Sequence, residues 1–206
     1  MKMNPFIYNT PVRGDDFCNR VDTIQRLLNQ TVTGKSQGNV WLVGERQVGK
    51  TSLLRYIQLA YEDFNERIHI YGSTETVKVA FIYFNCQTLK NPDDYYHHIY
   101  QSLINHFDFK HTEQENAYSC YIETFKRAYA SNYYIVLLLD EFDAFLKRLI
   151  QKNADQAEYL LSDINKMSQA FSEIKIEPKV FGCIFAANYT LSALVEKINV
   201  PVDTSV

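Results

Sequence analysis

The sequence predicts a three-layer α/β domain in which a mainly parallel sheet of about four strands is flanked by helices. Apolar runs of strand length alternate along the chain with longer segments of helical periodicity, which is typical of parallel sheets. A glycine-bounded turn joins the first expected strand to an amphipathic helix, as in a βα unit. With 206 residues, the chain is long enough to bury the core of one such domain.

The strands are expected in four short apolar runs. The run YYIVLLL at 133–139 is apolar on both faces, as expected of a central parallel strand. The four expected strands are 39–43, 77–84, 133–139 and 180–187.

Helices are expected between these strands, where apolar residues recur three and four positions apart. Asn91 is expected to cap one of them, with Pro92 at its first helical position. Thr112 to Glu115 matches a capping box for the next helix. The helical region 142–172 is expected to break near 152–155. The expected helices are 20–30, 52–61, 92–107, 112–130, 142–172 and 191–198.

Composition excludes several classes of protein. The four cysteines are far apart, with no C-x-x-C pair, so a disulfide framework or a structural metal is not expected. No run approaches the roughly 20 apolar residues of a membrane span, and the start lacks a signal-peptide core. We therefore expect a soluble cytoplasmic protein with no membrane partner. The net charge of −3 and the absence of a basic stripe leave a nucleic-acid partner possible but unsupported by charge.

Two segments are expected along the chain. Residues 1–16 contain Asn-Pro, Thr-Pro and Arg-Gly-Asp-Asp sequences, which predict an irregular amino-terminal arm. Residues 17–206 are expected to form the single core domain.

The segment GERQVGKT fits the phosphate-binding pattern G-x-x-x-x-G-K-[ST]. Its glycines let the backbone wrap around a phosphate, and the following helix points its positive end at the same place. Lys50 is expected to reach the β and γ phosphates, and the Thr51 hydroxyl to bind Mg²⁺. A glycine-rich surface turn is the competing interpretation. The expected nucleotide-binding residues of this turn are Gly44, Glu45, Arg46, Gln47, Val48, Gly49, Lys50, Thr51 and Ser52.

Two acidic residues follow the most apolar strand, at the edge of the sheet where ligands of α/β folds bind. Asp140 is expected to hold Mg²⁺, and Glu141 to accept the proton of the attacking water. Asn188 ends the fourth expected strand, where it can hydrogen-bond the water or the γ-phosphate. The competing interpretations are acidic residues that begin a helix and an asparagine that forms a turn.

The position of Glu141 separates classes of phosphate-binding proteins. In the recombinase-like branch the catalytic glutamate ends the strand after the P-loop helix, but here that strand ends without a carboxylate. The N-K-x-D sequence of a guanine site is also absent, because Asn165-Lys166 is followed by Met167-Ser168. The pattern therefore favours a P-loop NTPase fold of the ASCE, AAA-like type.

The motifs together resemble AAA-like ATPases of the STAND type. The resemblance rests on Asn4-Pro5-Phe6, Phe17-Cys18-Asn19-Arg20, the P-loop and Asp140-Glu141-Phe142-Asp143, although Asn19 replaces the usual glycine. It implies a switch, found in prokaryotic signalling or defence proteins, that binds ATP and Mg²⁺. It also implies that Phe17 and Arg20 lie against the adenine and that Asn188 is the first sensor.

The same resemblance implies a fifth strand and a helical lid with a sensor arginine, whereas this chain stops at Val206. We therefore expect a fragment, a truncated gene product or a protein completed by a partner, either in a homo-oligomer or through a missing lid and effector region. Hydrolysis in this chain alone is expected to be weak. Arg46, Arg127 and Arg148 are the arginines to test as stabilisers of transition-state charge.

The leading hypothesis from the sequence is an ATPase domain that acts as a nucleotide-dependent switch, with Lys50, Glu141 and Asn188 in catalysis. Two alternatives are a nucleotide-dependent DNA-handling AAA-like module and an interaction module that binds ATP without hydrolysing it.

Overall fold

The computed structural model describes residues 20–33, 38–62, 68–69, 76–111, 116–173 and 181–198. The arm expected at 1–16 and the expected adenine contact Phe17 lie outside these residues. The described elements, in chain order, are α1 (Val21–Leu28), a π-helical turn (Asn29–Thr33), β1 (Val40–Val43), α2 (Lys50–Glu62), β2 (Ile68–His69), β3 (Thr76–Asn85), a 3₁₀ turn (Cys86–Thr88), α3 (Pro92–Phe107), α4 (Ala117–Ala130), β4 (Tyr133–Asp140), α5 (Phe142–Lys152), α6 (Ala154–Glu173), β5 (Phe181–Ala187) and α7 (Leu191–Ile198).

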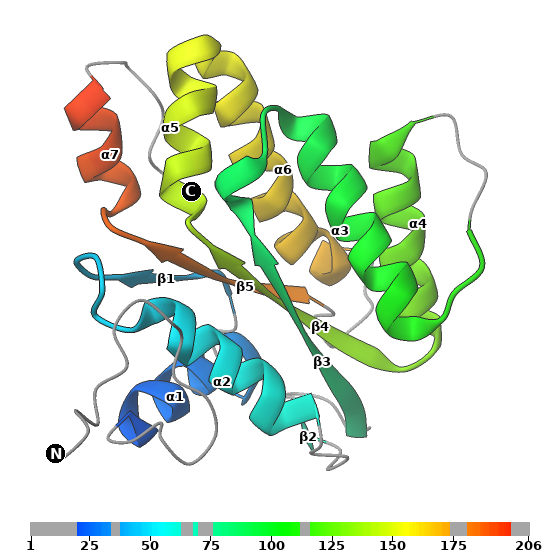
Figure 1. Ribbon diagram of the computed structural model, residues 1–206. Coiled ribbons are helices and arrows are strands. Elements are labelled where there is room, and N and C mark those ends of the chain that lie inside the picture. Colours follow the sequence, from blue (N-terminus) through cyan, green and yellow to red (C-terminus); the bar gives the residue numbers. More distant parts are fainter. Residues whose placement is uncertain are drawn as a thin grey trace, which may run out of the picture.

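The centre of the molecule is a five-stranded sheet in the order β1-β5-β4-β3-β2 (Figure 1). The pairs β1–β5, β5–β4 and β4–β3 are parallel, which confirms the expected sheet of four parallel strands. The two-residue strand β2 pairs antiparallel with β3 and was not predicted, because two residues give no periodic pattern.

Helices cover both faces of the sheet, as expected for parallel strands. In Figure 1, α1 and α2 lie on one face, and α3 to α7 lie on the other. Within the described ranges, no helix is both long and apolar enough to cross a membrane.

The central strand β4 alternates its side chains between two cores. Ile135, Leu137 and Leu139 belong to the larger core under α3 to α7. Tyr134, Val136 and Leu138 belong to the core under α1 and α2. Side chains of a strand alternate with a period of two. Asp140 therefore continues the even-numbered series and faces the helix that follows the P-loop.

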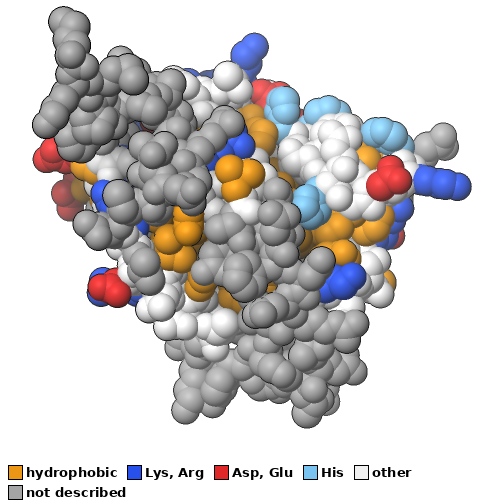
Figure 2. Space-filling view, turned by 60° about the horizontal axis from the view of Figure 1, so that its bottom comes forward, with side chains coloured by type: hydrophobic (Ala, Val, Ile, Leu, Met, Phe, Trp, Pro, Cys, Tyr) orange, Lys and Arg blue, Asp and Glu red, His pale blue; other side chains and the backbone are white. Residues whose placement is uncertain are grey.

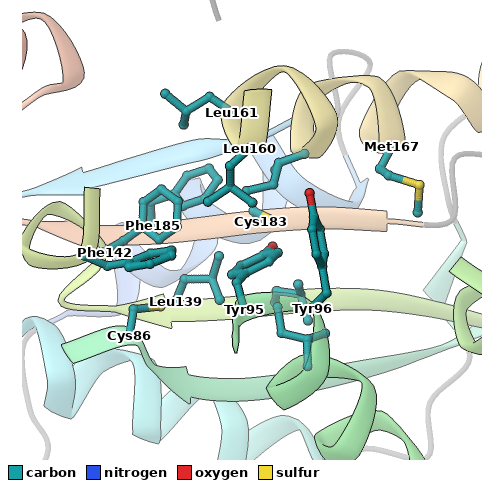
Figure 3. Packing of buried hydrophobic residues seen from close by; sticks show 14 of the residues in the cluster. Cys86, Tyr95, Tyr96, Leu139, Phe142, Leu160, Leu161, Met167, Cys183 and Phe185 are labelled. Carbon is teal, nitrogen blue, oxygen red and sulfur yellow. The ribbon is translucent and has the colours of Figure 1, made fainter. Parts of the chain in front are cut away.

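Aromatic and aliphatic side chains fill the larger core. Figure 3 shows Tyr95 of α3 and Leu160 of α6 packed against the middle strands of the sheet, which contribute Phe185 of β5. The buried Asp163 of α6 accepts hydrogen bonds from Tyr96 and Tyr118, at 3.0 and 2.9 Å. These bonds tie α3, α4 and α6 together, so the buried carboxylate is stabilised by two donors.

Most helix boundaries match the expectations. Asn91 caps α3 by accepting a hydrogen bond from the Asp94 backbone N–H at 2.8 Å, and Pro92 begins the helix. The expected break lies at Asn153, between α5 and α6. The capping box predicted at Thr112 to Glu115 lies outside the described residues. The described helix α4 begins at Ala117 and is capped by Asn116, whose side chain accepts from the Ser119 backbone N–H at 2.8 Å.

The strand register places the carboxyl ends of β1, β5 and β4 at one edge. Val43 pairs with Ala187, and Leu139 pairs with Phe185. The connections that follow these strands therefore lie side by side, as Figure 1 shows at the left of the sheet. The P-loop, Asn188 and Glu141 all belong to these connections.

Candidate functional site

The P-loop is a tight turn between β1 and α2, and its backbone requires glycine. Gly49 has a φ of 89°, which residues other than glycine rarely adopt. Gln47 also has a positive φ, of 66°. A Cβ on Gly44 would lie 3.0 Å from the Val48 side chain. The Gly44 N–H donates to the Ala187 carbonyl at 3.2 Å, which fastens the turn to β5.

The residues between the two glycines point outward. Glu45, Arg46, Gln47 and Val48 are exposed, whereas Ser52 is buried in the first turn of α2. Successive backbone N–H groups of such a turn can form an anion-binding concavity without these four side chains being buried in it.

Lys50 is held at the centre of the turn. Its ammonium group donates to the Gly44 carbonyl at 2.7 Å, to the Glu45 carbonyl at 2.8 Å and to Asn188 Oδ1 at 3.2 Å. Because a lysine ammonium has three protons, these bonds use its full donor capacity. The contact with Asn188 links the P-loop to the end of β5.

Asp140 and Thr51 lie together across the sheet edge. Asp140 is 2% exposed, and its Oδ2 accepts from the Thr51 hydroxyl at 2.7 Å and from the Tyr83 hydroxyl at 2.9 Å. Its Oδ1 accepts from the Glu141 backbone N–H at 3.1 Å. A hydroxyl and a carboxylate in contact, all oxygen, are the type of donor set that Mg²⁺ prefers. The residues therefore fit the cation that the sequence predicts.

Tyr83 is the second hydroxyl donor to Asp140. Burial and the neighbouring Asp140 carboxylate raise its pKa, so the phenol stays protonated and keeps donating. The Arg55 guanidinium lies 3.5 Å from the centre of the Tyr83 ring, a cation–π contact that fixes the ring.

Glu141 stands at the turn from β4 into α5, in the left-handed conformation with a φ of 53°. A positive φ in a residue other than glycine is uncommon, and the surrounding structure must hold it there. Burial raises the pKa of its carboxyl above the ordinary 4.5, and Asp140 and Asp143 raise it further. Arg46 and Lys50 oppose this shift. Together these effects favour a carboxyl that takes up a proton readily.

Asn188 follows β5 and contacts two charged groups. Its side-chain oxygen accepts from Lys50, and its backbone N–H and side-chain Nδ2 both donate to Asp143 Oδ2 at 3.0 Å. Asp143 lies in the first turn of α5 and is 4% exposed. The amide group therefore bridges the P-loop and α5.

A cavity of about 450 Å³ opens beside this group. Glu141, Asp143 and Asn188 line it, together with the cations Arg46 and Lys147. The predicted contact Arg20 lies near the same turn, because its guanidinium donates to the Val48 carbonyl at 2.6 Å. The P-loop, both acidic residues and Asn188 are thus brought together, as the sequence predicts.

The other two candidate arginines are engaged elsewhere. Arg148 donates to the carbonyls of Cys86, Gln87 and Leu89 at 2.6 to 3.2 Å. Arg127 donates to the Lys110 carbonyl at 2.7 Å. Arg46 is the one candidate of the three that lines the cavity beside Glu141.

Sequence reasoning missed two residues of the site. The sequence did not mark Tyr83 as a site residue, because it is one of many aromatic residues in apolar, strand-like runs. Tyr83 lies on the same side of β3 as Val79 and Phe81, so its ring faces α2. Asp143 belongs to the quoted Asp-Glu-Phe-Asp motif, but an acidic residue in a first helical turn also has an ordinary capping explanation.

The family model of the AAA domain matches residues 32–184, and the chain belongs to this family. The match spans both the P-loop and the Asp140-Glu141 pair. It agrees with the observed fold, an α/β P-loop fold with four parallel strands between helices.

Two curated relatives and two solved structures that resemble this chain are ORC proteins. An ORC1-type DNA replication protein of Pyrococcus horikoshii is 22% identical over 158 residues, which cover 71% of this chain and 32% of the relative. The ORC1-type protein of Thermococcus kodakarensis is also 22% identical, over 154 residues. The chain spans about a third of the length of these relatives.

Two solved archaeal structures share the fold. The ORC2 protein of Aeropyrum pernix, solved in ADPNP–ADP complexes, aligns with a TM-score of 0.60 and 19% identity, over 95% of this chain and 48% of that one. The ORC1 protein of the same organism, solved in complex with DNA, aligns with a TM-score of 0.53 and 18% identity, over 91% and 42%. The narrower STAND assignment finds no support in these comparisons.

The raised pKa of Glu141 predicts a pH-dependent effect on stability. The native state binds this proton more tightly than the unfolded chain, so the carboxylate lowers the free energy of unfolding as pH rises from 4.5 through the raised pKa. Glu141→Gln should therefore gain stability relative to the parent as pH increases from about 4 through the raised pKa. Urea unfolding measures the difference. The exposed Glu158→Gln is the control, and a pH-independent difference for Glu141→Gln would contradict the interpretation.

Proposed function

We propose that this chain is an ATP-binding AAA module that hydrolyses ATP slowly in the presence of Mg²⁺ and acts as a nucleotide-dependent switch. The observation that carries the proposal is the meeting of Lys50, the Thr51–Asp140 pair and Glu141 at one edge of the sheet. A surface turn with no ligand would not need a lysine held by two carbonyl groups of the turn and by Asn188, next to the Thr51–Asp140 pair.

The nucleotide phosphates would lie against the backbone N–H groups of the P-loop, at the amino-terminal end of α2. Lys50 would exchange its bonds to the Gly44 and Glu45 carbonyls for phosphate oxygens. Thr51 and Asp140 would hold Mg²⁺, which neutralises charge on the phosphates when it is bound. Arg20, whose guanidinium donates to the Val48 carbonyl, would itself lie close to the nucleotide.

Glu141 is proposed as the base that takes the proton of the attacking water. Its position at the strand end, its left-handed backbone and its raised pKa support this role. Asn188 would report the γ-phosphate through Lys50, since its oxygen already bonds the lysine ammonium. Release of Lys50 from this bond would couple nucleotide binding to the end of β5.

A DNA-handling role is the better supported biological context. The relatives are named as DNA replication proteins, and one of the similar structures contains DNA. The net charge is −3, and on the described part of the face in Figure 2 the basic side chains are scattered among acidic ones. We therefore propose that this chain supplies the nucleotide switch of a DNA-handling protein and itself makes few phosphate contacts.

The same site would also serve a STAND-type signalling switch in a larger protein, which is the narrower assignment that the sequence motifs favoured. The replication-type relatives support the DNA-handling context instead.

Lys50→Ala tests nucleotide binding. Mg-ATP at about 100 times its dissociation constant should add roughly 2.7 kcal/mol to the free energy of unfolding of the parent. The variant should lose most of this gain, because the Lys50 ammonium is the cation that the Gly44 and Glu45 carbonyls hold inside the turn. Thermal unfolding of each protein with and without Mg-ATP measures the stabilisation by the nucleotide. Each protein is compared with itself, so a change in the stability of the ligand-free variant does not affect the result. An unchanged melting temperature of the parent in millimolar Mg-ATP would refute the site.

Glu141→Gln tests hydrolysis. The variant keeps the size of the side chain and loses the base, so turnover should fall by roughly 100-fold or more, while stabilisation by Mg-ATP should persist. Phosphate release under saturating Mg-ATP measures the rate. Equal rates near background for the parent and the variant would instead support an interaction module that binds ATP without hydrolysing it.

DNA binding is tested by its salt dependence. With two phosphate contacts, the binding constant for a short duplex should fall roughly tenfold between 50 and 200 mM salt. Fluorescence anisotropy of labelled DNA, with ADPNP or with ADP present, measures the binding. If neither nucleotide supports DNA binding at 50 mM salt, the proposal that this chain contacts DNA is wrong.

A further inference from the structure

Asp143 is a buried carboxylate that the proposed chemistry does not use. It is 4% exposed, and a single oxygen, Oδ2, accepts both hydrogen bonds from Asn188. Its other oxygen, Oδ1, has no hydrogen-bond partner among the described residues. A buried carboxylate is costly unless its bonds compensate. The pair of bonds to Asn188 is therefore the principal interaction that the structure gives this group.

The two neighbours of Asn188 fix which end of its amide points where. An ionised carboxylate can only accept, so the NH₂ end must face Asp143, at 3.0 Å. An ammonium can only donate, so the oxygen end must face Lys50, at 3.2 Å. A flipped amide would put two donors against each other on one side and two acceptors on the other. The orientation of the amide thus follows from charge.

We propose that Asp143 is a positioning residue that makes Asn188 present its carbonyl oxygen, and not its NH₂ group, to the Lys50 side of the cleft. This inference rests on the proposed hydrolysis and deepens it. An oxygen at this place accepts a hydrogen bond from Lys50 or from a water molecule, whereas it repels a phosphate oxygen. Asn188 therefore orients the nucleophile or the lysine and does not donate to the phosphate.

The backbone bond gives Asp143 a second hold on the same residue. Because Asp143 Oδ2 also accepts from the Asn188 backbone N–H at 3.0 Å, it fixes the residue at the end of β5 as well as its side chain. A carboxylate that served only to complement the dipole of α5 would face the N–H groups of its own helix. Asp143 instead reaches across to another strand, so its interaction partner is the site.

Asp143→Ala tests the proposal with Asp143→Asn as the conservative variant. Loss of both bonds should lower kcat roughly 10- to 100-fold, while the dissociation constant of Mg-ATP should change less than about threefold. An asparagine oxygen can occupy the place of Oδ2 and accept both bonds, so Asp143→Asn should recover most of the loss. In an Asn188→Ala background, Asp143→Ala should have little further effect on kcat, since the two residues act as a unit.

Asp163→Ala is the matched control for instability. Asp163 is also a buried carboxylate that accepts two hydrogen bonds, but these come from Tyr96 and Tyr118 in the core between helices. Its loss should lower the melting temperature without changing kcat at a temperature where the variant is folded. Equal losses of kcat in Asp143→Ala and Asp163→Ala would overturn the positioning role.

A spectroscopic readout separates this inference from the proposed hydrolysis. In ¹H–¹⁵N spectra, the side-chain NH₂ signals of Asn188 are assigned by their absence from the spectrum of Asn188→Ala. Its protons should be shifted and slow to exchange in the parent and in Asp163→Ala, and should move and exchange faster in Asp143→Ala. If the parent turns over no faster than Glu141→Gln, the hydrolysis proposal fails and this readout alone decides the role of Asp143. An unchanged NH₂ pair in Asp143→Ala would overturn it.

Discussion

The parallel register of β1, β5 and β4 is the constraint on which the rest of the site depends. Val43 is level with Ala187, and Leu139 with Phe185, so three strands end along one line. The residues that follow them converge without any long loop to carry them. The Gly44 N–H, which donates to the Ala187 carbonyl, extends the ladder by one bond into the P-loop itself. The site is thus an extension of the sheet.

Charge organises the cleft once the sheet has assembled it. Three carboxylates, of Asp140, Glu141 and Asp143, stand within four residues, and the Glu141 pKa responds to the other two. The three carboxylates differ in their hydrogen-bond partners and in their exposure to solvent. Asp140 accepts hydrogen bonds from two hydroxyl groups and a backbone N–H on its two oxygens, whereas Asp143 accepts both of its bonds from Asn188 on a single oxygen. Glu141 is more exposed and lines the cavity beside Asn188.

Helix packing on the far face holds this arrangement in place. The carboxylate of Asp163 joins α3, α4 and α6, and Arg148 of α5 donates to three carbonyls of the turn after β3. Because α5 carries Asp143 in its first turn, the helix that lies over the sheet also sets the orientation of Asn188. The position of α5 is therefore linked to the geometry of the cleft by the bonds between Asp143 and Asn188.

The sequence alone determined the sheet, its four parallel strands, the P-loop and the Asp140–Glu141 pair, because apolar periodicity and glycine spacing are local patterns. It could not determine the contact of Tyr83 with Asp140, the bond from Lys50 to Asn188 or the role of Asp143. These interactions join residues that lie 45 to 138 positions apart. Which strands become neighbours, and which face each side chain takes, is decided when the sheet closes between its two layers of helices, and only the tertiary structure records that choice.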